Sequence, residues 1–111
     1  MKFSVIIPTY NRANIVLLTI DSLLHQDFPR EDFEIIIVDN NSTDNTEELI
    51  QNIITKNQGQ ANIRYAKELR QGDVYARNSG ASIASGEYLY FTDDDALFDT
   101  SMLLEMANIL D

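Results

Sequence analysis

The sequence predicts a three-layer α/β/α domain in which helices cover both faces of a mostly parallel sheet of about four strands. Runs of β-branched and aromatic residues alternate with segments of helical periodicity along the whole chain. Alternation at this spacing is typical of right-handed crossovers between parallel strands. With 111 residues, the chain is also long enough for one domain with a hydrophobic core. We therefore assign residues 1–111 to a single domain.

Four segments have the composition of strands. They are residues 2–7, 33–38, 61–66 and 88–92. The second of them contains the unbroken apolar run from Ile35 to Val38, which is typical of a strand covered on both faces. We expect Pro8 to end the first strand, because proline cannot donate to the hydrogen-bond ladder.

Helical periodicity follows each predicted strand. We expect helices over residues 13–25, 74–84 and 100–110, and another that begins at Asp44. Asn11 is a candidate cap for the first helix, and Asp44 with Glu47 resembles a capping box. The helix over residues 74–84 is built from small residues, which allow a helix to lie close to a sheet or a ligand.

Polar side chains gather in three loops that follow predicted strands, at residues 8–12, 39–43 and 93–95. The carboxyl ends of parallel strands meet at one edge of a sheet, where ligands bind. Residues 93–95 are three consecutive aspartates, whose like charges repel each other. Hard divalent cations prefer carboxylate oxygens, so we predict a metal-dependent site for an anionic ligand. The same three residues would also serve as a solvated turn, and the residues alone leave both interpretations open.

Composition excludes several classes of function. The net charge of −10 and the pI near 4.3 argue against nucleic-acid binding, which needs a basic surface. This acidic charge is compatible with a phosphate-bearing ligand that binds through a metal cation. The chain has no cysteine, which excludes disulfides and thiolate metal sites and is compatible with the cytoplasm. The apolar run at residues 5–7 is too short for a signal peptide or a membrane span.

Familiar nucleotide and metal motifs are missing from the polar loops. The first loop lacks the Gly-x-Gly-x-x-Gly of dinucleotide-binding folds, and no Gly-Lys-Ser/Thr of a P-loop is present. A calcium loop starting at Asp39 would place Asp44 where a glycine is needed and Ile50 where a bidentate glutamate is needed.

Two side chains in these segments suit a nucleotide. An acid at the end of the second strand, Asp39, is placed to hydrogen-bond a ribose or a base, although aspartate also stabilises turns. The guanidinium of Arg77 suits a phosphate or a planar base, but Arg77 and Asn78 could equally form a surface pair.

Four motifs together resemble the N-terminal half of the family 2 glycosyltransferases. They are residues 5–12 (VIIPTYNR), 37–44 (IVDNNSTD), Gly72 with 76–80 (ARNSG), and 86–95 (GEYLYFTDDD). Each motif is weak alone, but their order and spacing cover essentially the whole chain. The resemblance implies a Rossmann-like GT-A fold, a nucleotide-sugar donor, a divalent metal, and transfer of the sugar with inversion at the anomeric carbon.

The resemblance also implies roles for donor-site residues. Asp39 resembles the acid that contacts the donor base, and Thr9 and Arg77 resemble residues around the nucleoside. A UDP-sugar is the expected donor, by its frequency in the family. The expected acceptor is a saccharide or a lipid-linked saccharide, as in polysaccharide biosynthesis.

The three aspartates match the Asp-x-Asp signature of the resembled family. Asp95 would bind Mg²⁺ or Mn²⁺ directly, and Asp93 would lie toward the metal, the ribose or the sugar. Asp94 occupies the variable middle position, and we include it among the substrate-binding residues.

In the resembled family, the base that deprotonates the acceptor lies in the C-terminal half. We therefore assign no catalytic residue, and expect the base and the acceptor-binding half to lie beyond Asp111. Residues 1–111 would then be a donor-binding half with little or no activity alone, prone to self-association through an exposed sheet edge. In the full-length protein we expect a cytoplasmic location, at the inner face of the membrane. The alternative function is a non-catalytic nucleotide-binding or assembly module on the same scaffold.

Overall fold

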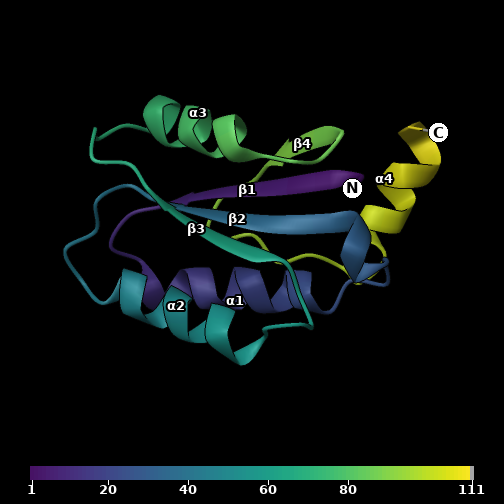
Figure 1. Ribbon diagram of the computed structural model, residues 1–111, viewed down its shortest axis with the longest axis horizontal. Coiled ribbons are helices and arrows are strands. Elements are labelled where there is room, and N and C mark those ends of the chain that lie inside the picture. Colours follow the sequence, from purple (N-terminus) through teal and green to yellow (C-terminus); the bar gives the residue numbers. More distant parts are fainter. Residues whose placement is uncertain (111) are drawn as a thin grey trace.

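The computed structural model describes residues 1–110 and contains one sheet of four parallel strands (Figure 1). The strands are β1 (Phe3–Thr9), β2 (Phe33–Asp39), β3 (Ile63–Lys67) and β4 (Tyr88–Phe91). Their order across the sheet is β3-β2-β1-β4. The chain moves outward from β1 to β3 and then crosses to the far side of β1. The strand order therefore reverses between β1 and β4, and this reversal places the ligand crevice of an α/β sheet.

Helices cover both faces of the sheet, which confirms the three-layer prediction. Helices α1 (Ala13–Leu24) and α2 (Thr46–Lys56) lie on one face, and α3 (Asp73–Ile83) lies on the other (Figure 1). A short 3₁₀ turn, η1 (Arg30–Asp32), leads into β2, and α4 (Met102–Leu110) lies near the amino-terminal end of the sheet. Among residues 1–110, no helix is both long and apolar enough to cross a membrane.

The core has two parts, one on each face of the sheet. Alternate residues of β1 and β2 point to the face of α1 and α2, where they form the larger cluster with Leu103 of α4. The smaller cluster, under α3, contains Ile6, Ile36, Val38 and Ala76. Every residue of β2 is buried, as the unbroken apolar run predicts for a strand covered on both faces.

The first strand continues through Pro8, contrary to the prediction that proline ends it. Pro8 pairs with Val38, and Thr9 pairs with Asp39. The carbonyl of Ile6 accepts a hydrogen bond on the β4 side, and Pro8, two residues later, presents its backbone to the same side. Because β4 pairs with β1 only as far as Ile6, the missing N–H of Pro8 interrupts no ladder.

Both predicted helix caps are wrong in detail. Residue Arg12 occupies the N-cap of α1, while Asn11 has a left-handed φ of 51° and accepts the N–H of Thr43 at 2.7 Å. Asn11 therefore joins the loop after β1 to the loop after β2 instead of capping a helix. The N-cap of α2 is Asn45, one residue after the predicted Asp44. Asp44 still accepts a backbone hydrogen bond at this helix start, from the N–H of Thr46 at 3.0 Å.

Candidate functional site

A polar cleft of about 600 Å³ opens between the carboxyl ends of β1 and β4 and the start of α3. It is lined by Pro8, Arg12, Asp73, Arg77, Tyr90, Phe91, Thr92, Asp93, Asp94 and Asp95. A second hollow of about 250 Å³ shares part of this lining and adds Thr9, Tyr10 and Asn40. The cleft lies where the strand order reverses, which is the expected position for a ligand.

The middle aspartate points inward and fixes the loop after β4. Asp94 is only 8% exposed, and its carboxylate accepts a hydrogen bond from the Thr9 hydroxyl at 2.9 Å. Its backbone carbonyl accepts a second bond, from the Thr19 hydroxyl on α1 at 2.7 Å. Asp94 thus has a defined place in the structure, whereas the family signature treats its position as variable. With Asp94 anchored, Asp93 and Asp95 are left exposed on the cleft.

The outer aspartates supply oxygen ligands suited to a divalent cation. Within residues 1–110, no group of three or more His, Cys, Asp or Glu side chains is placed to hold a metal. Mg²⁺ usually binds through one or two carboxylates together with substrate phosphates and water. Asp93 and Asp95 therefore fit a cation held jointly by the protein and a phosphate-bearing ligand.

Two arginines bring positive charge to this acidic cleft. The guanidinium of Arg12 lies 3.6 Å from an Asp94 oxygen and 3.5 Å from an Asp95 oxygen. The guanidinium of Arg77, whose side chain is 48% exposed, lies 4.8 Å above the Phe91 ring and 3.7 Å from Asp73. A ligand in the cleft thus meets both signs of charge, which suits a diphosphate accompanied by a metal ion.

Asp39 lies behind the cleft wall rather than on it. It is 1% exposed at the end of β2, opposite Thr9. One carboxylate oxygen accepts the N–H of Ser42 at 2.9 Å, and the other accepts the Tyr65 hydroxyl at 2.7 Å. Burial and this hydrogen bond to Asp39 raise the pKa of Tyr65, so its hydroxyl stays protonated and donates. Both carboxylate oxygens of Asp39 are therefore hydrogen-bonded within the protein.

The structure brings most of the predicted residues together and adds others. Thr9, Arg77 and the three aspartates all line the cleft or its adjoining hollow, and Asp39 stands one strand away. Among the lining residues that our sequence reasoning did not name as site residues are Arg12, Asn40 and Asp73. The first two lie in the polar loops predicted to form the site, so their position in those loops was an available signal.

The chain matches the family model described as glycosyl transferase family 2 over residues 4–111. It is 33% identical over 111 residues to the poly(ribitol-phosphate) beta-N-acetylglucosaminyltransferase TarS of Staphylococcus aureus, which covers 100% of this chain and 19% of that protein. It is 36% identical over 109 residues to the poly(ribitol-phosphate) beta-glucosyltransferase of Bacillus spizizenii, which covers 97% of this chain and 17% of that protein. The chain thus spans about a fifth of the length of these curated relatives.

Solved structures agree with the sequence match. Staphylococcus aureus TarS in complex with UDP has a TM-score of 0.88 and 34% identity, covering 100% of this chain and 32% of that one. The mannosyltransferase PcManGT from Pyrobaculum calidifontis, in complex with GDP-Man and Mn²⁺, has a TM-score of 0.90 and 31% identity. This match covers 98% of this chain and 32% of that one. The fold is that of a GT-A glycosyltransferase. More narrowly, the chain belongs to glycosyl transferase family 2, which confirms the resemblance seen in its motifs.

Proposed function

We propose that this domain binds the nucleotide-sugar donor of a glycosyl transfer reaction, and that the donor is a UDP-sugar. The observation that carries the proposal is the cleft at the reversal of strand order, where Asp93 and Asp95 face Arg12 and Arg77. The relatives support it, since TarS is described in complex with UDP and with UDP-GlcNAc.

The proposed roles follow the position of each side chain. We place the nucleoside near Thr9 and Arg77, with Arg77 offering a cation beside the Phe91 ring. We keep Asp39, which pairs with Thr9 behind the cleft wall, as the residue that contacts the donor base, and this contact requires the wall to open. The Asp94 carboxylate borders both hollows and holds Thr9, so it contributes to the same donor site.

The outer aspartates would hold the metal, Mg²⁺ or Mn²⁺. We assign Asp95 as the direct ligand, and Asp93 to the metal and to the ribose or sugar. When bound, such a metal neutralises the negative charge that develops on a departing diphosphate. The mannosyltransferase relative described with GDP-Man and Mn²⁺ supports the use of a divalent metal.

In the proposed reaction, the acceptor hydroxyl oxygen bonds to the anomeric carbon as the bond from that carbon to the diphosphate oxygen breaks, with inversion. The hydroxyl proton passes to a carboxylate base, which we place outside residues 1–111. The residues of this domain bind and orient the donor. We therefore propose that residues 1–111 alone show little or no transfer to an acceptor, which we take to be a saccharide or a lipid-linked saccharide of a surface polysaccharide.

Calorimetric titration of UDP into the chain, with Mn²⁺ and then with EDTA, tests the donor site. We expect binding that requires the metal and is weakened at least about tenfold in Asp95→Ala, because the cation loses its main protein ligand. Asp99→Ala is the matched control, since Asp99 is exposed outside the cleft. A parallel titration with GDP tests the preference for uridine.

Two results would reject this function. Equal binding of UDP with and without metal, unchanged in Asp95→Ala, would reject the metal-dependent donor site. No binding of any nucleotide would favour the non-catalytic assembly module instead.

A further inference from the structure

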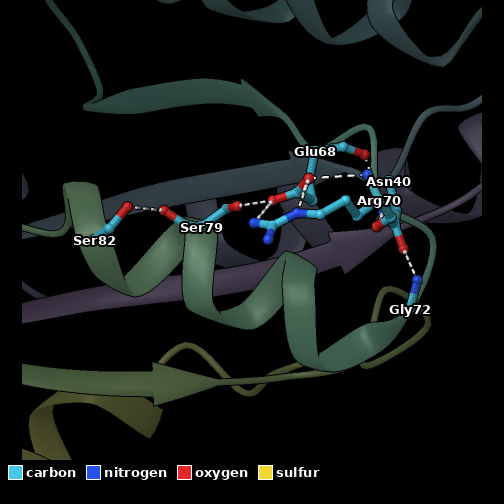
Figure 2. A network of polar contacts seen from close by, with 6 residues as sticks. All are labelled: Asn40, Glu68, Arg70, Gly72, Ser79 and Ser82. Atoms are coloured by element: carbon cyan, nitrogen blue, oxygen red, sulfur yellow. Dashed lines mark hydrogen bonds and ion pairs between the residues drawn. The ribbon is translucent and has the colours of Figure 1, made fainter.

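The connection between β3 and α3 wraps around a single side chain, Asn40 (Figure 2). Asn40 is buried at the end of β2. Its amide nitrogen donates to the carbonyls of Glu68 at 3.0 Å and Arg70 at 2.8 Å, and its amide oxygen accepts the N–H of Gly72 at 2.9 Å. Both amide hydrogens and the oxygen are used, so one side chain fixes three points of this connection.

Glu68 joins the same connection to the middle of α3. The side chain of Glu68 is buried, with the residue 8% exposed. Its carboxylate accepts the Arg70 backbone N–H at 2.9 Å, the Arg70 guanidinium at 3.0 and 3.2 Å, and the Ser79 hydroxyl at 2.6 Å (Figure 2). A buried carboxylate without such partners would strongly destabilise the fold. These hydrogen bonds together offset the cost of burying the Glu68 carboxylate.

These contacts hold the helix that forms one wall of the cleft. Asp73 and Arg77 of α3 line the cleft, whereas Ser79 lies two residues beyond Arg77, on the opposite side of the helix. The start of α3 is fixed through Asn40 and Gly72, and its middle through Glu68 and Ser79. Asn40 itself borders the smaller hollow. The network therefore connects directly to the place of the proposed ligand.

We propose that Asn40 and Glu68 are positioning residues of the donor site, which hold α3 so that the Arg77 guanidinium lies over Phe91 in the cleft. This inference rests on the proposed donor binding. Neither side chain has to touch the donor for this role. A small displacement of α3 moves Arg77 away from its position, and binding sites are sensitive to such shifts.

The test removes one contact and leaves the rest of the network in place. Ser79→Ala deletes the hydroxyl that reaches Glu68, while the Arg70 contacts still pair the carboxylate. We expect UDP affinity in the presence of Mn²⁺ to fall about three- to tenfold, which is about the net worth of one ordinary hydrogen bond. Ser82→Ala is the matched control, because Ser82 lies on the same helix and bonds only to the Ser79 carbonyl. Its affinity should stay within about twofold of the unsubstituted chain.

A second readout separates positioning from a general loss of stability. The NMR resonance of the Arg77 side-chain N–H should shift in nucleotide-free Ser79→Ala and stay in place in Ser82→Ala. Ser79→Thr, which keeps the hydroxyl, should restore both the resonance and the affinity. Ser79→Ala with unchanged affinity and an unchanged Arg77 resonance would overturn the proposal, even if its melting temperature falls.

The two proposals fail in different ways. If the unsubstituted chain binds no nucleotide, the proposed function fails, and the Arg77 resonance in the nucleotide-free protein alone decides the positioning role. A shift confined to Ser79→Ala then supports positioning, and the absence of that shift rejects it.

Discussion

At the scale of single residues, Arg12 is the side chain with the most direct effect on the proposed metal site. Its guanidinium lies within 3.6 Å of carboxylate oxygens of both Asp94 and Asp95. It therefore balances negative charge that a metal would otherwise balance, and it repels an incoming cation.

We predict that Arg12→Gln strengthens the binding of Mn²⁺ to the nucleotide-free protein. Loss of a positive charge a few ångströms from the metal is worth about 1 kcal/mol in a solvated site, which is about fivefold in affinity. Calorimetry or the electron paramagnetic resonance signal of free Mn²⁺ measures the change. Arg30→Gln, at a surface arginine away from the cleft, controls for net charge. Weaker Mn²⁺ binding in Arg12→Gln would contradict the prediction.

Glu68 makes the stability of the fold depend on acid pH. Hydrogen bonds from the Arg70 and Ser79 side chains lower the pKa of Glu68 from 4.5 to about 2. A carboxyl whose pKa is lower in the folded chain stabilises the fold fully above its unfolded pKa. That contribution is lost as the pH falls from about 4.5 toward 2.

We predict that Glu68→Gln is less stable than the unsubstituted chain at pH 7, and that the difference narrows as the pH falls from about 5 to 2.5. The stabilising contribution of Glu34 is lost in the same pH range. Burial raises the pKa of Glu34, but hydrogen bonds from Ser4, Ser85 and Arg64 outweigh this effect and lower it. Because both proteins contain Glu34, its effect cancels in the difference between their stabilities. Melting temperatures measured across this range give the result, and a constant difference would refute the role of Glu68.

Residues that follow strands were the predictable part of the site. Asp93, Asp95 and Arg12 each lie close after a strand, and the strand pattern alone places them at the ligand-binding edge. The inward direction of Asp94 and the bond between Glu68 and Ser79 depend on contacts between residues 85 and 11 positions apart in the chain. Local sequence patterns carry no information about such pairs.

At the scale of the elements, Gly80 sets the distance between α3 and the sheet. A Cβ atom at Gly80 would lie 2.4 Å from the Ile6 Cγ2 atom and 3.1 Å from the Val38 Cγ2 atom. Ile6 and Val38 are fully buried β-branched residues, so neither can move aside without disturbing the sheet. The helix lies this close because the residue has no side chain.

We predict that Gly80→Ala destabilises the domain, although alanine favours a helix by about 1 kcal/mol. Overpacking a tight core typically destabilises by about 1–3 kcal/mol, so the clash should exceed the gain in helix propensity. Urea denaturation measures the net change, with Ser82→Ala as the exposed control on the same helix. A Gly80→Ala domain as stable as the unsubstituted chain would show that α3 can move away from the sheet freely. UDP affinity should fall with stability, because the same helix carries Arg77.

The bounds of the elements were predictable where burial decides them and less so where caps decide them. The apolar run of β2 correctly indicated a strand covered on both faces. The predicted caps Asn11 and Asp44 failed because each of these side chains had several backbone partners within reach. The loop after β2 competes for Asn11, and sequence alone does not show which partner it takes.

At the scale of the whole molecule, the alternation of strands and helices predicts a parallel sheet but does not give the strand order. The reversal between β1 and β4 brings the loops after these two strands together into one cleft. The strand pattern predicted that the polar loops meet at one edge of the sheet, but it did not predict which strands are neighbours there. The site is therefore a property of the topology, since its aspartates and Arg12 are more than 80 residues apart in the chain.

The edge of strand β4 is the surface feature through which we expect copies of the chain to associate. Strand β4 pairs with β1 on one side, and within residues 1–110 no strand pairs with its other edge. Leu89 of β4 is 42% exposed beside that edge. Unpaired edges with apolar side chains favour strand pairing between molecules. The net charge of −10 opposes such contact, but salt screens the repulsion.

We predict that the chain self-associates through β4, and more strongly as the salt concentration rises from about 0.05 to 0.5 M, where the screening length falls below about 5 Å. Light scattering after gel filtration measures the mass at each salt concentration. Leu89→Lys should keep the chain monomeric, because a charge on an edge strand discourages pairing. Leu18→Lys, at an exposed position on α1, should leave the association unchanged. A monomeric mass at every salt and protein concentration would show that the edge of β4 makes no such contact.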